Sequence, residues 1–127
     1  MNDLRKKNII VTGATGGIGN SIIKKLDEYG ANILASGTKS EKLEDLKKRF
    51  SNLKLLKFDI TQSEKIENFI DEATSQLGGK LDCIVNNAGI TQDNLAIRMS
   101  LDEWKNVIDI NLTSTFLMCK FAIKKML

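Results

Sequence analysis

Residues 12–19 read TGATGGIG and are the part of this chain with the clearest capacity for chemistry. They follow apolar residues 9–11 and precede residues 20–26, whose apolar side chains recur at helical spacing. A glycine turn between a strand and a helix presents backbone N–H groups and the positive end of the helix dipole to an anion. The pattern therefore predicts a site for the pyrophosphate of a dinucleotide, although a plain flexible turn is the alternative.

The residues of this turn have separate expected roles. Glycine lets a phosphate approach the backbone, because no Cβ holds it away. We expect Gly13, Gly17 and Gly19 to form the phosphate turn, with Thr15 and Ile18 as backbone contacts. A second motif, the sequence NNAG at residues 86–89, follows the apolar residues 81–85 and argues against the flexible-turn alternative.

Together, TGxxxGIG and the later NNAG resemble the short-chain dehydrogenase/reductase family, and the resemblance runs from Lys7 to the last residue. It implies a nicotinamide dinucleotide cofactor with a set of contacts along the chain. In this resemblance Asp59 meets the adenine amino group, Ile60 packs on the adenine ring, and Asn111 helps to hold a water in a proton relay. The cofactor riboses are expected to contact Asn87, Ala88 and Gly89.

The end of the second predicted strand selects between cofactors. A carboxylate there accepts hydrogen bonds from the ribose hydroxyls of NAD and repels a 2′-phosphate. Here residues 36–39 read SGTK, and the first acid is Glu41. We therefore expect NADP(H) to be favoured over NAD(H), with Thr38 and Lys39 as donors to the 2′-phosphate. Against this, Gly16 stands where NADP-using relatives often carry a basic residue, and Lys39 is alternatively a plain surface lysine.

Residues 86–99, NNAGITQDNLAIRM, followed by Glu103 and Trp104, narrow the resemblance to the bacterial 3-oxoacyl-acyl-carrier-protein reductases. That resemblance implies NADPH-dependent reduction of a 3-ketoacyl thioester on acyl carrier protein in fatty-acid biosynthesis, a part of lipid metabolism, by a homotetramer. The chain departs from the family in lacking the catalytic serine and Tyr-x-x-x-Lys. Its single tyrosine, Tyr29, has no lysine four residues on. A reductase of another ketone or alcohol and a non-catalytic dinucleotide-binding protein stay open as alternatives.

Composition excludes several other classes of protein. The chain has no histidine, which excludes a histidine base, a Ser-His-Asp triad and histidine-ligated zinc. The net charge of +3 comes from lysines spread along the chain, so no nucleic-acid partner is expected. No apolar run reaches the length of a membrane span. Cys83 and Cys119 lack metal-ligand spacing and are expected to be packing residues of a cytoplasmic protein, with Cys83 in a buried strand.

The elements that position these residues alternate along the chain. The patterns predict strands over residues 7–12, 32–36, 53–58 and 81–85. Helices are expected at 17–29, from a Ser40 cap to residue 50, from Thr61 or Ser63 to 77, and from a capping box at Ser100 and Glu103 to the last residue.

Alternating units of this kind predict an α/β fold, a Rossmann-like doubly wound parallel sheet of strand order 3-2-1-4 with helices on both faces. Residues 1–127 are expected to form a single dinucleotide-binding domain. An apolar helical pattern continues to Leu127, so we expect the chain to be the N-terminal portion of a longer protein, truncated before its Tyr-x-x-x-Lys.

Overall fold

The computed structural model describes residues 3–89 and 93–127, so Ile90, Thr91 and Gln92 of the narrower motif lie outside the described residues. Four parallel strands form one sheet in the order β3-β2-β1-β4, as the sequence predicts. These strands are β1 (Asn8–Val11), β2 (Asn32–Gly37), β3 (Lys54–Lys57) and β4 (Cys83–Val85).

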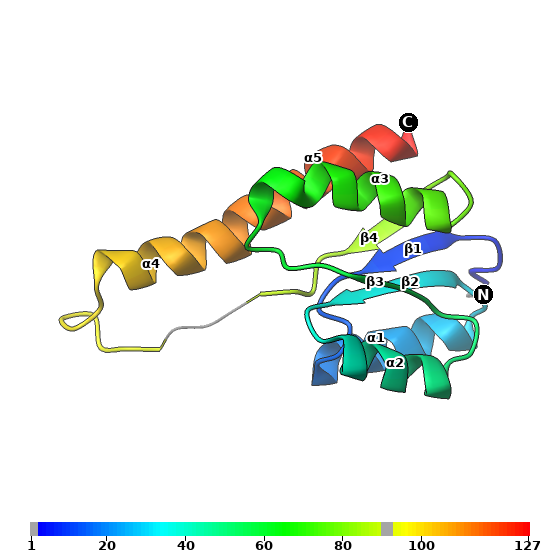
Figure 1. The fold of residues 1–127 in the computed structure, drawn as a ribbon, viewed down its shortest axis with the longest axis horizontal. Coiled ribbons are helices and arrows are strands. Elements are labelled where there is room, and N and C mark those ends of the chain that lie inside the picture. The colour runs from blue at the N-terminus through cyan, green and yellow to red at the C-terminus, as the bar shows by residue number, and fades with distance from the viewer. Residues whose placement is uncertain (1–2, 90–92) are drawn as a thin grey trace.

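Helices cover both faces of this sheet (Figure 1). Helices α1 (Gly17–Glu28) and α2 (Ser40–Arg49) lie on one face, and α3 (Ile66–Gln76) and α5 (Ser114–Met126) lie on the other. Each strand therefore sends alternate side chains into two separate cores. Ile10 and Leu34 belong to the core under α3 and α5, whereas Ile9 and Ile33 belong to the core under α1 and α2. Burial on both faces explains why the strands read as continuous apolar runs.

The exact ends of the helices depend on capping residues and short turns, which the pattern of apolar residues does not fully predict. Gly30, with φ +84°, follows α1 as a left-handed residue just past the end of the helix. The expected Ser40 cap is wrong, because Lys39 is the N-cap of α2 and Ser40 is its first helical residue. The third helix begins with a short 3₁₀ turn, η1 (Ser63–Lys65), before α3.

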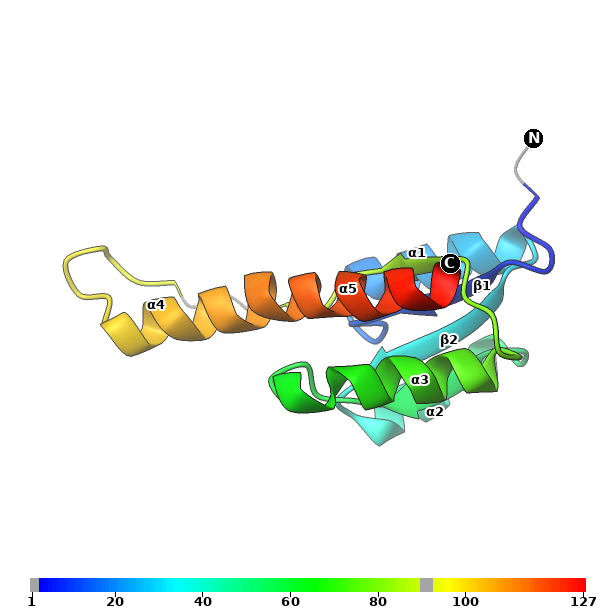
Figure 2. The ribbon, with the colours of Figure 1, turned by 90° about the horizontal axis from the view of Figure 1, so that it is seen from above.

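The last helical segment begins as an arm outside the body and ends with α5 packed against it (Figure 2). It consists of α4 (Leu101–Val107), a π-helical turn η2 (Ile108–Thr113) and α5, so the expected uninterrupted α-helix is wrong over six residues. The Ser100 hydroxyl accepts the Glu103 N–H at 3.1 Å, which confirms the cap at the start of this segment. The Glu103 carboxylate accepts from Asn94 Nδ2 at 3.3 Å.

The cysteines correct one expectation of burial. Cys83 is exposed, because β4 is an edge strand with no neighbour on its outer side among the described residues. Cys119 is half-buried and accepts from Asn86 Nδ2 at 3.4 Å, which joins the end of β4 to α5. In the described part of the chain, no helix has the length and apolar character needed to cross a membrane.

Candidate dinucleotide-binding site

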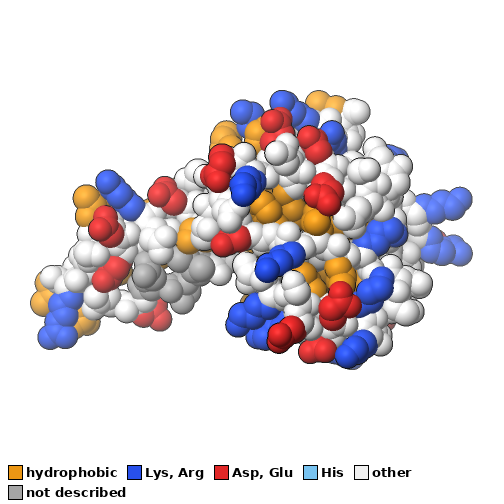
Figure 3. Space-filling model, in the orientation of Figure 1, with side chains coloured by type: hydrophobic (Ala, Val, Ile, Leu, Met, Phe, Trp, Pro, Cys, Tyr) orange, Lys and Arg blue, Asp and Glu red, His pale blue; other side chains and the backbone are white. Residues whose placement is uncertain are grey.

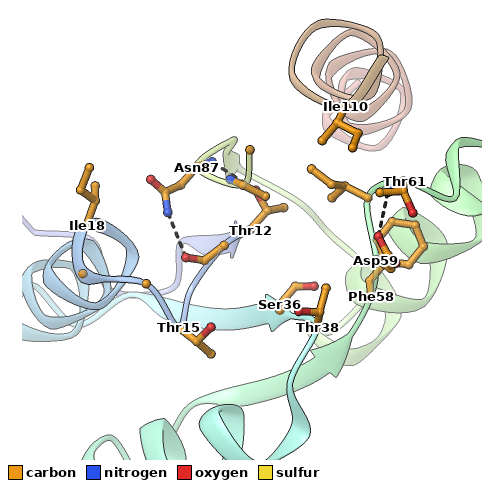
Figure 4. A pocket seen from close by; sticks show the side chains of 17 residues that line it. Thr12, Thr15, Ile18, Ser36, Thr38, Phe58, Asp59, Thr61, Asn87 and Ile110 are labelled. Carbon is orange, nitrogen blue, oxygen red and sulfur yellow. Dashed lines mark hydrogen bonds between the residues drawn. The ribbon is translucent and has the colours of Figure 1, made fainter. Parts of the chain in front are cut away.

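A cavity of about 470 Å³ lies at the carboxyl ends of the strands, beside the point between β1 and β4 where the strand order reverses. This is where open parallel sheets bind their ligands, and the volume lies in the range of small-molecule sites. Its walls come from the turn after β1 and the segments after β2, β3 and β4 (Figure 4). The lining residues are Thr12, Gly13, Thr15, Gly16, Gly17, Ile18, Ser36, Gly37, Thr38, Phe58, Asp59, Ile60, Thr61, Asn87, Ala88, Gly89 and Ile110.

Gly13 begins the glycine turn in a conformation that only glycine adopts freely. Its φ is +60°, and a Cβ there would lie 2.8 Å from the Ala88 Cα. The Asn87 side chain donates from Nδ2 to the Gly13 carbonyl at 2.9 Å (Figure 4). The glycine turn and the NNAG motif are therefore in direct contact, and we call this contact between Gly13 and residues 87–88 the joint. Both the backbone conformation and the lack of space require glycine at position 13.

Thr12 holds the other side of this joint and was not singled out by the sequence analysis. Its hydroxyl oxygen accepts the N–H groups of Asn87 at 3.1 Å and Ala88 at 3.0 Å. It also donates to the Val85 carbonyl at 3.3 Å. The signal available in the sequence was a hydroxyl residue at the end of an otherwise apolar strand, directly before the turn.

The remaining turn residues divide into an open side and a packed side. Gly17 has no atom within 4 Å of the place where a Cβ would stand, and Ile18 is 72% exposed, so both face open space at the cavity. Gly19 is buried and does not line the cavity, since a Cβ there would lie 2.9 Å from the Ala14 Cα. Gly19 thus lets helix α1 pack against the turn, and its contribution to binding is indirect.

The segment after β2 contributes a hydroxyl and no carboxylate. Thr38 lines the cavity, whereas Lys39 does not. Thr15 sits over the end of β2, because a Cβ on Gly37 would lie 3.4 Å from the Thr15 Cγ2. The structure therefore brings Thr15 and Thr38 to one wall and leaves Lys39 on the adjacent surface as the N-cap of α2.

The segment after β3 forms the opposite wall. Asp59 accepts the Thr61 N–H at 2.9 Å, which fixes the half-buried carboxylate at the cavity (Figure 4). Ile60 lies beside it, and Ile110 of η2 closes this side from above. Thr61 and Ile110 are further lining residues that the sequence analysis did not assign to the site.

Asn111 lies next to the cavity, in the π-helical turn. A Cβ on Gly89 would stand 3.0 Å from the Asn111 Oδ1, so the carboxamide borders the end of the NNAG motif. The turn is tied to the site, because Ser114 Oγ lies 2.9 Å from the Ile60 carbonyl and 3.2 Å from the Asp109 carbonyl. Single π turns occur often at functional sites, where they redirect a side chain.

The charges at the cavity suit binding better than proton transfer. Asp59 is the one ionisable side chain among the residues that line it, and all other lining side chains are neutral. Tyr29 is the C-cap of α1, at the opposite end of that helix from the glycine turn. Among residues 3–89 and 93–127, no group of His, Cys, Asp and Glu side chains is arranged to hold a metal ion.

The fold and the site define a class of protein, one whose parallel α/β sheet binds a dinucleotide at a glycine turn. Residues 7–127 match the family model described as short chain dehydrogenase. The chain therefore belongs to the short-chain dehydrogenase/reductase family, as the two sequence motifs imply.

Several characterised proteins are similar to this chain. It is 41% identical to a 3-oxoacyl-acyl-carrier-protein reductase FabG of Rickettsia conorii and covers 51% of that protein. It is 36% identical to the FabG of Aquifex aeolicus, covering 52% of it. The nodulation protein G of a Rhizobium strain is 38% identical over 117 residues. The chain thus spans about half the length of the curated relatives it matches.

The solved structures agree with this family. A short-chain dehydrogenase/reductase from Brucella melitensis superposes with a TM-score of 0.89 at 28% identity, covering 99% of this chain and 54% of that one. A short-chain dehydrogenase/reductase mutant from Serratia marcescens gives a TM-score of 0.90 at 25% identity, covering 97% of this chain and 52% of that one. The short-chain dehydrogenases/reductases are oxidoreductases that use a nicotinamide dinucleotide. Membership of this family accounts for the cavity and its glycine turn.

Proposed function

We propose that this chain is the cofactor-binding portion of an NADPH-dependent 3-oxoacyl-acyl-carrier-protein reductase of fatty-acid biosynthesis. The observation that carries the proposal is the joint between Gly13 and the NNAG motif at the floor of the cavity. Support for the substrate class comes from the relatives named FabG, because their full name describes a reductase of 3-oxoacyl groups on acyl carrier protein.

The cavity residues fit a dinucleotide. Gly13 and Gly17 leave the turn free of side chains, so a pyrophosphate can approach the N–H groups at the start of α1. Asp59 offers an acceptor for an adenine amino group, and Ile60 offers an apolar surface for its ring. Asn87, Ala88 and Gly89 line the part of the cavity between the turn and Asn111, where the riboses would lie.

A bound nicotinamide supplies the hydride for reduction of a ketone, and the described residues contribute binding and orientation. In this proposal Asn111, whose carboxamide borders Gly89, holds a water at the nicotinamide end of the cavity. Within this proposal the protein works in the cytoplasm as a homo-oligomer. Ten large apolar side chains are exposed among the described residues, and eight of them lie in the last helical segment and in the loop before it, which supports self-association.

The cofactor preference follows from the end of β2. Thr38 lines the cavity there and no carboxylate does, so a 2′-phosphate meets no repulsion at this wall. We expect the protein, expressed from its complete gene, to bind NADPH more tightly than NADH in a fluorescence titration. The Thr38→Asp variant should reverse the order, because its carboxylate would repel the 2′-phosphate. Equal or tighter binding of NADH by the unaltered protein would contradict the NADP assignment.

A non-catalytic dinucleotide-binding protein is the second candidate, because Asp59 is the one ionisable side chain among the described residues that line the cavity. The gene sequence beyond Leu127 separates the two. A downstream serine and Tyr-x-x-x-Lys support the reductase, and a stop codon directly after Leu127 supports the binding protein. Substrate profiling of the complete protein tests for a different ketone or alcohol.

A further inference from the structure

Ser114, the first residue of α5, carries a buried hydroxyl that is 3% exposed. Its Oγ lies 2.9 Å from the carbonyl of Ile60, which is 54 positions away in the chain, and 3.2 Å from the carbonyl of Asp109. Since both neighbours are acceptors, the hydroxyl has to donate, and the nearer oxygen of Ile60 receives its one proton. Ser114 therefore connects the last helical segment to the segment after β3.

This hydroxyl lies where the helix changes its hydrogen-bond pattern. The Ser114 N–H donates to the carbonyl of Asp109, five residues back, as in a π turn. In an α-helix the same N–H would donate to the residue four positions back, Ile110. A change from π to α pairing would remove one residue from the turn. It would therefore rotate the residues before the turn by about 100° relative to α5.

The residues that such a rotation would displace are the ones that the π turn brings to the cavity. Ile110 lines the cavity beside the wall formed by the segment after β3 (Figure 4). The Asn111 carboxamide borders the cavity at Gly89. Thr115 supports the turn from within the helix, because its Oγ1 donates to the Asn111 carbonyl at 2.7 Å. Ser114 instead holds the turn against another segment, and so fixes its position relative to the sheet.

We propose that Ser114 is a positioning residue of the reductase, which acts through Asn111 by holding η2 in its π arrangement against Ile60. The proposal rests on the proposed function, since a role for Asn111 in the reaction presumes a reductase. Ile60 is also the residue proposed to pack on the adenine ring, so its carbonyl belongs to the cofactor wall. The hydrogen bond from Ser114 thus links the adenine end of the cavity to the end at Asn111.

Replacing Ser114 by alanine removes the hydroxyl and tests this role. In the protein expressed from its complete gene, the kcat for NADPH oxidation with an acetoacetyl thioester should fall about three- to tenfold, the range expected for one hydrogen bond. The Kd of NADPH should stay within about twofold, because the glycine turn and Asp59 are unchanged. A general loosening of the cavity would raise that Kd as well, so the split between kcat and Kd distinguishes the two.

Amide hydrogen exchange gives a second readout, which does not depend on activity. In Ser114→Ala, the amides of residues 108–114 should exchange about three- to tenfold faster, because opening of the turn no longer breaks the bond to Ile60. Exchange in β1 and β2, at the centre of the sheet, should be unchanged.

A double-mutant cycle tests whether Ser114 acts through Asn111. Asn111→Ala removes the carboxamide by itself. If the hydroxyl serves to place that carboxamide, adding Ser114→Ala to Asn111→Ala should change kcat by less than about twofold. If instead the losses of the two single variants multiply, Ser114 acts independently of Asn111 and the proposal is overturned.

Two variants control for packing. Thr74 of α3 has an equally buried hydroxyl, and no hydrogen-bond partner is found for it among the described residues. Thr74→Val should therefore leave both kcat and the exchange of η2 unchanged. Ser114→Cys fills the space of serine with a weaker donor. Its kcat should lie between those of the unaltered protein and Ser114→Ala, and it takes over the test if circular dichroism shows that Ser114→Ala is unfolded.

The outcomes separate the positioning role from the function on which it rests. If the complete protein does not reduce the thioester with NADPH, the proposed function fails, and hydrogen exchange still decides whether Ser114 holds η2. If the protein is a reductase and Ser114→Ala keeps its kcat and its exchange pattern, the positioning role alone is overturned. Faster exchange with unchanged kcat would also overturn it, because the π arrangement would then not matter to the reaction.

Discussion

Thr12 is almost fully buried, yet its hydroxyl supports the backbone that forms the binding site. It is 3% exposed, and its oxygen accepts the backbone N–H groups of Asn87 and Ala88. Thr12→Val keeps the shape but leaves those N–H groups without an acceptor. We expect a loss of about 1–3 kcal/mol in the free energy of unfolding, together with weaker dinucleotide binding. Urea denaturation measures the first effect and a cofactor titration the second.

Thr12→Ser is the matched control, because it retains the hydroxyl. Its stability and affinity should lie much closer to those of the unaltered protein than to those of Thr12→Val. A fully stable Thr12→Val variant would show that the NNAG segment does not depend on this hydroxyl.

Two glycines of the same turn should respond to alanine in different ways. Gly13→Ala combines a φ of +60° with a contact at 2.8 Å to the Ala88 Cα, so it should destabilise the fold by more than about 1 kcal/mol. Gly17→Ala meets no atom within 4 Å, so the fold should tolerate it. Its methyl group stands at the open side of the turn, where it should weaken NADPH binding by about tenfold or more.

Thermal denaturation and cofactor titration of both variants test the division between a structural and a binding glycine. Unchanged affinity in a folded Gly17→Ala variant would show that the pyrophosphate does not approach this residue. Gly19 is a poor probe of binding, because it is buried against Ala14 and its substitution by valine would disturb α1 itself.

At this scale the sequence predicts the types of residue better than their places. Gly13, Asp59 and Asn87 line the cavity because each lies two residues after the end of a strand, and strand ends can be read from the apolar pattern. Lys39 cannot be placed in this way. Whether it faces the cavity depends on the rotation of α2 about its axis, and that rotation is fixed by packing of Leu43 and Leu46 in the core.

Among the elements, β1 and β4 are held together at their amino ends by Asp82. Its Oδ2 accepts the Asn8 N–H at 2.8 Å, and its own N–H donates to the Asn8 carbonyl at 3.0 Å. The hydrogen bond from Asn8, helped by Lys80 and Lys7, holds the pKa of the Asp82 carboxyl below its usual range. A lowered pKa means that ionised Asp82 stabilises the folded state.

Asp82→Asn should therefore lower the free energy of unfolding at neutral pH and remove part of its pH dependence. The difference between the two proteins should be constant above the unfolded pKa of about 4. It should then disappear as the pH falls through the lower, folded pKa. Denaturation curves at several pH values between neutrality and pH 3 measure this difference. A gap that widens in acid would contradict the assigned direction of the pKa shift.

The elements themselves were largely predictable, and their boundaries less so. Strand order and helix positions follow from the two periodicities of the apolar residues, which the two cores confirm. The π turn η2 was not visible, because its backbone pairing depends on contacts of Ser114 with Ile60 and Asp109. The contact with Ile60 joins segments far apart in the chain, and no local pattern encodes it.

For the whole molecule, the last helical segment, formed by α4, η2 and α5, leaves the largest number of apolar side chains exposed among the described residues. Trp104, Leu112 and Phe116 are each more than half exposed along it. Figure 3 shows hydrophobic side chains at its tip, while acidic and basic side chains intermingle over the body on the same face. An apolar surface of this extent favours contact with further protein. It is consistent with the homo-oligomer proposed above.

The last prediction concerns what residues 1–127 can do by themselves. Reduction of a ketone requires an acid to protonate the alkoxide as hydride arrives. The residues that line the cavity offer one ionisable group, Asp59, and it lies at the end expected for adenine. Tyr29 is the C-cap of α1, at the opposite end of that helix from the glycine turn, and the chain has no histidine. These residues should therefore bind NADPH without reducing a 3-ketoacyl thioester.

NADPH oxidation with an acetoacetyl thioester measures this, comparing residues 1–127 with the protein expressed from its complete gene. Loss of a positioned acid alone costs roughly 10²–10⁴-fold in rate. A missing substrate wall adds to that loss, because the ketone is no longer held against the cofactor. The control is a titration showing that both proteins bind NADPH. Turnover by residues 1–127 within roughly tenfold of the complete protein would place the proton donor inside this chain, against the expectation.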